Sequence, residues 1–126
     1  MPGKRHILVV DDETYIADVL CRRFERMGFS VESADSLTSA ALAIKAQPPD
    51  IVVCDVQIDA RNDARDVYAL AKAHNPAVHL VAMSGHAKDA PSVQKVLLTG
   101  VEIFLKKPFV SLKETSERIA ALLGTT

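Results

Sequence analysis

The sequence predicts a single α/β domain in which a five-stranded parallel sheet lies between two layers of helices. Five short apolar runs alternate with five segments whose apolar residues recur at helical spacing. This alternation is typical of repeated strand–helix–strand units, which form doubly wound sheets. The chain has 126 residues, enough for one such domain. We expect it to extend over residues 5–124.

The predicted strands comprise residues 7–10, 29–34, 51–54, 78–83 and 101–105. The first and third are continuous runs of apolar residues rather than runs of alternating polarity. Such runs are expected of strands that are buried on both faces, as in the centre of a parallel sheet.

The predicted helices follow the strands in turn. They comprise residues 12–27, residues 36–47, a third helix after a polar loop at residues 57–66, a fourth from Pro91 to Gly100, and residues 111–123. Gly28 ends the first helix, and Ser36 caps the second. The dipeptide Asn75-Pro76 ends the third helix, because proline cannot continue a helix.

The composition excludes several classes of protein. Hydrophobic residues make up 48% of the chain and charged residues 25%, which indicates a globular domain. The net charge of -1 gives no reason to expect direct nucleic-acid binding. There is no apolar run of about 20 residues that would span a membrane, and no signal peptide is expected. Cys21 and Cys54 fall in helix and strand patterns, which fits reduced thiols and a cytoplasmic location.

Polar residues of a particular kind stand at the ends of four predicted strands. Asp11 and Asp12 follow the first strand, and Asp55 follows the third. Ser84 follows the fourth strand, and Lys107 follows the fifth. Ligands bind at the carboxyl ends of the strands in open parallel sheets. The five side chains are therefore predicted to form one site.

The chemistry of this set points to a divalent cation and a phosphoryl group. Two carboxylates about 4 Å apart repel by about 4 kcal/mol at an effective dielectric constant of 20, so three of them need a cation or protons. Oxygen ligands with places left for water suit Mg²⁺, and a carboxylate can accept a phosphoryl group covalently. Each residue alone has an ordinary explanation, such as a helix cap for an aspartate or a turn for Ser84. Their joint placement is what favours a site.

The sequence resembles the response-regulator receiver domains of bacterial two-component signalling along its whole length. Four motifs carry the resemblance, namely VVDDE at residues 9–13, VCDV at 53–56, MSG at 83–85 and FLKKPF at 104–109. The resemblance implies a flavodoxin-like fold with strand order 2-1-3-4-5. It also implies that Asp55 is the phosphoacceptor, and that Asp11, Asp12, Asp55 and the backbone carbonyl of Gln57 bind Mg²⁺.

The same resemblance assigns roles to residues at the ends of the fourth and fifth strands. Ser84 would bond to a phosphoryl oxygen, Lys107 would pair with the phosphoryl group, and the Lys107–Pro108 peptide bond would be cis. On phosphorylation Ser84 would move and Phe104 would rotate inward, changing the face formed by the fourth helix, the fifth strand and the fifth helix. The resemblance therefore implies a signalling domain rather than an enzyme, with self-catalysed phosphotransfer and autodephosphorylation as its own chemistry.

The implied partners are a sensor histidine kinase or a histidine phosphotransfer protein as donor, and an unknown downstream protein. The candidate contacts with the donor are Ile16, Leu20, Pro108 and Phe109. No membrane and no direct nucleic-acid partner is expected.

One segment departs from the family pattern. Asp59 and Asp63 stand where the family usually has proline and glycine after the acceptor, so we expect a mobile or rearranged loop at residues 57–63. His86 is expected to flank the mouth of the site. The loop keeps an alternative open, that of a degenerate receiver acting as a phosphorylation-independent adaptor.

Two rival classes fit less well. A phosphohydrolase that forms an aspartyl phosphate would need a second aspartate where Gln57 stands. A flavodoxin-like cofactor domain would need a phosphate-binding loop in place of the acidic residues 11–13, which would repel phosphate.

Overall fold

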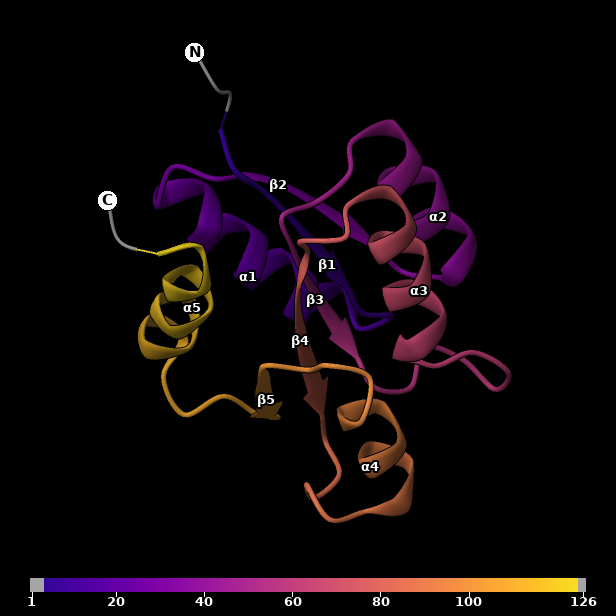
Figure 1. Ribbon diagram of the computed structural model, residues 1–126. Helices are drawn as coiled ribbons and strands as arrows, with labels where there is room; N and C mark the ends of the chain where they lie inside the picture. Colours follow the sequence, from indigo (N-terminus) through magenta and orange to yellow (C-terminus); the bar gives the residue numbers. More distant parts are fainter. Residues whose placement is uncertain (1–3, 125–126) are drawn as a thin grey trace.

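The computed structural model describes residues 4–124 and contains one five-stranded sheet (Figure 1). The strands are parallel and lie in the order β2-β1-β3-β4-β5, which confirms the predicted topology. Their bounds are β1 (His6–Val10), β2 (Ser30–Ala34), β3 (Ile51–Asp55), β4 (His79–Ser84) and β5 (Ile103–Lys106).

Helices cover both faces of the sheet, so the domain has three layers. They are α1 (Thr14–Arg26), α2 (Leu37–Ala46), α3 (Ala64–His74), α4 (Pro91–Leu97) and α5 (Leu112–Ala120), which a short 3₁₀ turn η1 (Ala121–Leu123) extends. α1 and α5 lie together on one side of the sheet, and α2 and α3 lie on the other (Figure 1). α4 packs into the same core as α2 and α3 and contacts β4. No helix in the described part of the chain is long and apolar enough to cross a membrane.

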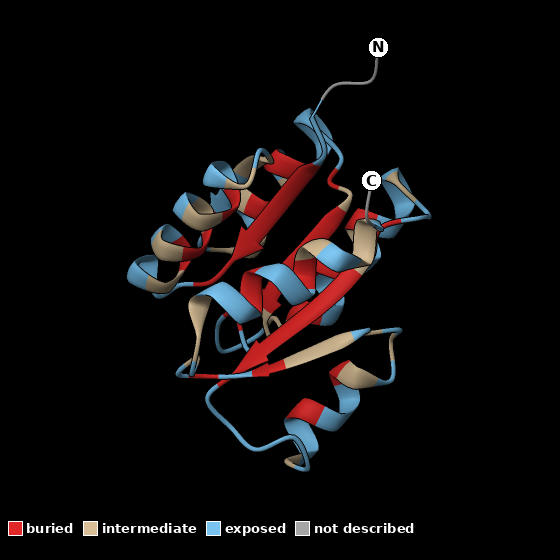
Figure 2. Ribbon diagram, turned by 90° about the vertical axis from the view of Figure 1, so that its left-hand side faces the viewer, coloured by how far each residue is buried: buried red, intermediate tan, exposed pale blue. Residues whose placement is uncertain are grey.

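The side chains of each central strand divide between two cores. In β1, Leu8 and Val10 pack with the residues of α2, α3 and α4, whereas Ile7 and Val9 pack with those of α1 and α5. This division follows from the two-residue period of a strand, and Figure 2 shows the central strands as buried. Continuous apolar runs are therefore needed in the centre of this sheet.

The predicted ends of several elements are shifted. The first helix begins at Thr14 rather than at residue 12, because Glu13 has extended backbone angles and stands at the cap position. The fifth strand runs from Ile103 to Lys106, so Val101 and Glu102, which were assigned to it, lie before it. Ser36 caps α2 as expected, and its hydroxyl accepts a hydrogen bond from the Ser39 N–H.

Tyr68 is a large core residue that was not predicted from the sequence. Tyr68 on α3 is almost fully buried, and its hydroxyl donates a 2.8 Å hydrogen bond to the backbone carbonyl of Val81. Tyrosine can be buried when its hydroxyl has a partner. The helical pattern alone gave no signal for that partner, which lies on a strand 13 residues further along the chain.

Candidate functional site

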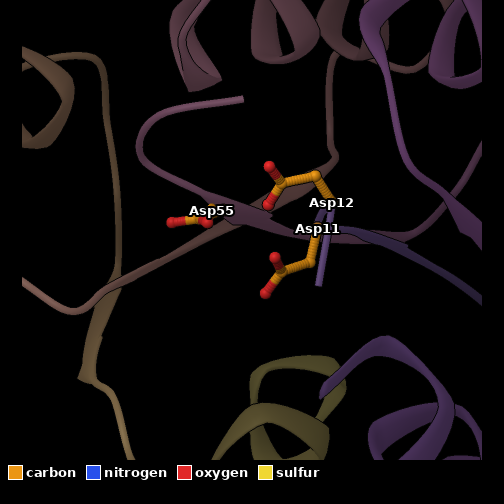
Figure 3. Close-up of side chains that lie close together, drawn as sticks. All are labelled: Asp11, Asp12 and Asp55. Atoms are coloured by element: carbon orange, nitrogen blue, oxygen red, sulfur yellow. The ribbon is translucent and has the colours of Figure 1, made fainter. Parts of the chain in front are cut away.

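The three aspartates predicted at the strand ends meet in the structure. One carboxylate oxygen from each of Asp11, Asp12 and Asp55 lies within 4.8 Å of those of the other two (Figure 3). The strand register explains this proximity: Val10 pairs with Cys54, so Asp11 directly after β1 and Asp55 at the end of β3 come next to each other. Asp11 is buried, Asp55 is half-buried and Asp12 is exposed. The acidic cluster therefore opens toward solvent on one side.

Lys107, the first residue after β5, reaches the same cluster. Its Nζ lies 3.1 Å from Asp11 Oδ2, 2.8 Å from Glu13 Oε1 and 3.2 Å from Asp55 Oδ2. The Lys107 backbone N–H donates to the carbonyl of Ser84, which fixes the start of the loop after β5. The Lys107–Pro108 peptide bond is cis, as the family resemblance implied.

Burial sets the electrostatics of this site. It raises the pKa of Asp55 to about 6, and the negative charge of Asp11 adds to this shift while Lys107 opposes it. Burial also raises the pKa of Asp11 above its usual range. Burial lowers the pKa of Lys107, but the contacts with Glu13, Asp55 and Asp11 outweigh it and hold that pKa above its ordinary value.

The donor set fits a hard divalent cation. Three carboxylates converge, and burial makes the negative forms of two of them costly without a counter-charge. Oxygen-only ligands are those that Mg²⁺ prefers.

An open cavity of about 500 Å³ lies over Asp55. Ser84 is buried at its wall, and its hydroxyl accepts a 2.9 Å hydrogen bond from the His86 N–H. His86 is exposed and lines the cavity, so it flanks the mouth of the site as expected. The predicted residues that line this cavity are Ile16, Asp55, Gln57, Ser84, Lys107 and Pro108.

The loop at residues 57–63 is tied together by its own polar residues. Asp59 Oδ1 accepts hydrogen bonds of 2.8 Å from the backbone N–H groups of Arg61 and Asn62. The Gln57 side-chain amide donates to the backbone carbonyls of Asp59 and Asn62, and Gln57 pairs with Asp63 in an isolated antiparallel bridge. The loop thus forms a small closed turn without proline or glycine. Its mobility stays a prediction.

The comparison with known protein families agrees with this geometry. The sequence model of the family described as "Response regulator receiver domain" matches residues 7–120. The chain belongs to this family. Its members are signalling domains of two-component systems, whose partner is a histidine kinase, and they generally bind Mg²⁺ at an acidic pocket.

The receiver domain is similar to larger curated proteins. "Probable transcriptional regulatory protein TcrX" of Mycobacterium tuberculosis (strain ATCC 25618 / H37Rv) is 33% identical over 121 residues, which are 95% of this chain and 50% of TcrX. "Photosynthetic apparatus regulatory protein RegA" of Cereibacter sphaeroides is 29% identical over 104 residues, which are 82% of this chain and 55% of RegA. This chain thus spans about half the length of these relatives.

Solved structures agree with the receiver fold. The receiver domain of NtrX from Brucella abortus is 30% identical with a TM-score of 0.76, and the match covers 94% of this chain and 99% of that one. A response regulator receiver domain protein (CheY-like) from Methanospirillum hungatei JF-1 has a TM-score of 0.83 at 22% identity. That match covers 96% of this chain and 94% of the other, and at this identity it shows the fold alone.

The prediction that Leu20 contacts the phosphodonor protein is wrong. Leu20 is 0% exposed and packs with Phe24, Ile7 and Ile119 in the core between α1, α5 and the sheet. A partner protein cannot reach a fully buried side chain. Pro108 is exposed, and Ile16 and Phe109 are half-buried, so these three remain accessible candidates.

Phe104 of the receiver domain is half-buried and packs against the core under α2, α3 and α4. It also lines a second cavity, of about 320 Å³, between β5 and α5. A ring with free space on one side and core on the other can have two positions. Its movement stays a prediction.

Two charged neighbours of the site, Glu13 and Lys106, were not predicted from the sequence. Glu13 forms the shortest contact to Lys107, and Lys106 Nζ donates to the backbone carbonyls of Gly85 at 2.8 Å and of Lys107 at 3.1 Å. The only signal for Glu13 was its position directly after the aspartate pair. Lys106 gave none, because an exposed lysine at a strand end is common.

Proposed function

We propose that this receiver domain accepts a phosphoryl group on Asp55 from a phosphohistidine of a sensor histidine kinase or a histidine phosphotransfer protein. The observation that carries the proposal is the placement of the Lys107 ammonium 3.2 Å from Asp55 Oδ2, beside the cluster of Asp11 and Asp12. An acceptor carboxylate, a fixed cationic donor and a set of oxygen ligands are together the components that phosphoryl transfer needs.

Asp11, Asp12, Asp55 and the backbone carbonyl of Gln57 are the residues that would hold Mg²⁺. When bound, Mg²⁺ would offset the negative charges of the acceptor carboxylate and the phosphoryl group together. The raised pKa values of Asp11 and Asp55 support this assignment, because a cation would relieve the cost of their buried charges.

In the transfer step, an Asp55 carboxylate oxygen forms a bond to phosphorus while the bond from phosphorus to the donor imidazole nitrogen breaks. The imidazole nitrogen keeps the electron pair. Lys107 then donates a hydrogen bond to a phosphoryl oxygen, and the Ser84 hydroxyl donates another. To reset the domain, a water oxygen attacks phosphorus, and the Asp55 carboxylate leaves with the electrons of the broken bond.

The output would follow from a change of charge at the site. A phosphoryl group adds about 1.5 to 2 negative charges. Ser84 would turn toward it and give up the hydrogen bond from the His86 N–H, and Phe104 would move into the vacated space. The face made by α4, β5 and α5 would then favour a different protein partner, as a population shift.

The remaining assignments concern partners and location. The downstream partner of this domain is a protein not identified by the sequence, and the domain itself makes no direct nucleic-acid contact, which its net charge of -1 supports. We place the domain in the cytoplasm, since Cys21 and Cys54 are both free thiols.

The proposal is tested by intact mass spectrometry after incubation with acetyl phosphate, with and without Mg²⁺. Wild type should gain one phosphoryl group in a Mg²⁺-dependent manner, and Asp55→Asn should gain none. If wild type gains none, the alternative of a phosphorylation-independent adaptor is favoured, with the unusual loop at residues 57–63 as its distinguishing feature.

A further inference from the structure

All three N–H donors of the Lys107 ammonium have carboxylate partners. An ammonium group has three N–H donors, and three carboxylates, those of Asp11, Glu13 and Asp55, lie within hydrogen-bond distance of it. A phosphoryl oxygen at Asp55 can therefore bond to Lys107 only if one of these contacts is given up.

The three contacts are not equally easy to release. The side chain of Asp11 is 0% exposed and that of Asp55 is 14% exposed, whereas that of Glu13 is 61% exposed. A carboxylate that leaves Lys107 must be solvated, and the Glu13 side chain is by far the most exposed of the three. Yet the Glu13 contact is the shortest of the three, at 2.8 Å.

We infer that Glu13 is a positioning residue that holds the Lys107 ammonium in the unphosphorylated domain and restrains the transfer of a phosphoryl group to Asp55. This inference rests on the proposed function of Asp55. Glu13 acts in two ways. It competes with the phosphoryl oxygens for a donor of Lys107, and its negative charge lines the cavity that an anionic phosphodonor must enter.

Local structure favours this arrangement. Glu13 is the cap residue of α1, and its side chain makes no capping hydrogen bond, so its carboxylate is free to reach Lys107. Its backbone N–H donates to Asp11 Oδ1 at 2.9 Å, which ties the position of Glu13 to the acidic cluster. The Glu13 carboxylate thus has no described partner other than the lysine of the site.

The experiment compares initial rates of phosphorylation by acetyl phosphate for wild type, Glu13→Gln and Glu25→Gln, in Mg²⁺ and over a range of donor concentrations. Glu25 is an exposed glutamate near the other end of α1 that forms no ion pair in the described part of the chain, so its variant has the same change of charge. Glu13→Gln should be phosphorylated about two to five times faster. Glu25→Gln should match wild type.

Salt separates the effect of charge from the effect of contact. The part of the increase that comes from the exposed charge should shrink as ionic strength rises, whereas the part due to the released ammonium should persist. Glu13→Asp keeps the negative charge but is one methylene shorter. It should therefore still repel the anionic donor as wild type does, but should no longer hold the Lys107 ammonium, so its rate should lie between those of wild type and Glu13→Gln.

A second readout does not depend on phosphorylation. In metal-free protein, the effects of Glu13→Gln and Lys107→Met on unfolding by urea should be non-additive in the double variant, because the two residues share one contact. Additive effects, or a Glu13→Gln rate equal to or below that of wild type, would overturn the inference. If wild type is not phosphorylated at all, the proposed function fails and the inference fails with it, which is distinguishable from a failure of Glu13 alone.

Discussion

Lys107 Nζ lies 3.2 Å from Asp55 Oδ2, although Asp55 ends β3, Lys107 directly follows β5, and β4 lies between these two strands. The long side chain of Lys107 spans this gap, while its backbone N–H donates to the carbonyl of Ser84 at the end of β4. A compact ammonium on a flexible chain is suited to this task, because its three donors can be redirected. The carboxylate that we propose as the acceptor is thus already paired with a lysine in this structure.

Asp55→Asn should stabilise the metal-free protein at neutral pH. The pKa of Asp55 is raised to about 6 in the folded state, against about 3.9 in an unfolded chain, so folding binds a proton. The stability that this proton contributes is present below pH 4 and is lost as the pH rises through 6. The variant should therefore be more stable by about 1–3 kcal/mol at pH 7.5, and by less at pH 5.

Urea unfolding followed by circular dichroism measures this difference, since the chain has no tryptophan for fluorescence. A destabilised Asp55→Asn protein at pH 7.5 would mean that the ion pair with Lys107 outweighs the burial of the carboxylate.

Mg²⁺ should stabilise the wild-type protein against unfolding. At a concentration one hundred times its dissociation constant, a ligand that binds only the folded state adds about 2.7 kcal/mol. Asp12→Asn removes an exposed carboxylate of the cluster and should reduce this gain. Asp35→Asn, which changes an exposed aspartate after β2, is the matched control and should keep the full gain. Equal gains in both variants would contradict the assignment of Asp12.

Tyr68→Phe should lower the stability by about 1–2 kcal/mol, because it removes a buried hydroxyl that donates to the carbonyl of Val81. The site side chains are untouched, so phosphorylation should proceed at the wild-type rate. Tyr15 is 75% exposed, and Tyr15→Phe serves as the control with little change in stability. Urea unfolding measures the stability, and intact mass measures phosphorylation. A loss of phosphorylation in Tyr68→Phe but not in Tyr15→Phe would contradict the claim that the Tyr68 hydroxyl affects stability alone.

His6 should destabilise the domain in mild acid. It is buried at the start of β1, its Nδ1 lies 2.9 Å from Ser30 Oγ, and its Nε2 has no hydrogen-bond partner among residues 4–124. Burial lowers the pKa of His6, against the opposing charges of Glu32 and Asp50. The unfolded chain therefore binds a proton near pH 6.5 that the folded protein resists, and stability falls as the pH drops below that value.

This effect is measured best in an Asp55→Asn background, where the opposite trend of Asp55 is absent. There, unfolding free energy should fall from pH 7 to pH 5, and His6→Gln should flatten the dependence. His74→Gln changes an exposed histidine on α3 and should leave the slope as it was. An unchanged slope in His6→Gln would assign the acid sensitivity to other groups.

Sequence alone could predict the fold and most of the site for a simple physical reason. Buried parallel strands need uninterrupted apolar runs, and the residues that follow them emerge at one edge of the sheet. The convergence of Asp11, Asp12 and Asp55 follows from the register of β1 and β3. The presence of Lys107 in the same site was also predicted, because its motif follows the fifth strand.

Other features depend on side-chain geometry that no periodicity encodes. Ile16 and Leu20 share a helical face in the sequence pattern, yet Ile16 lines the cavity near the start of α1 whereas Leu20, one turn further along, is fully buried in the core between α1, α5 and the sheet. The partner of Tyr68 and the contact of Glu13 with Lys107 join elements that are distant in sequence. In the loop at residues 57–63, the Asp59 side chain closes a turn at the position where the family usually has proline.

The location of the phosphoryl group tests the central claim most directly. After reaction with acetyl phosphate and Mg²⁺, reduction with borohydride converts an aspartyl phosphate to homoserine, which tandem mass spectrometry can place in the sequence. We expect homoserine at position 55 and nowhere else, and none when Mg²⁺ is left out. Homoserine at position 11 or 12, or a phosphoryl group that persists in Asp55→Asn, would contradict the assignment of Asp55 as the acceptor.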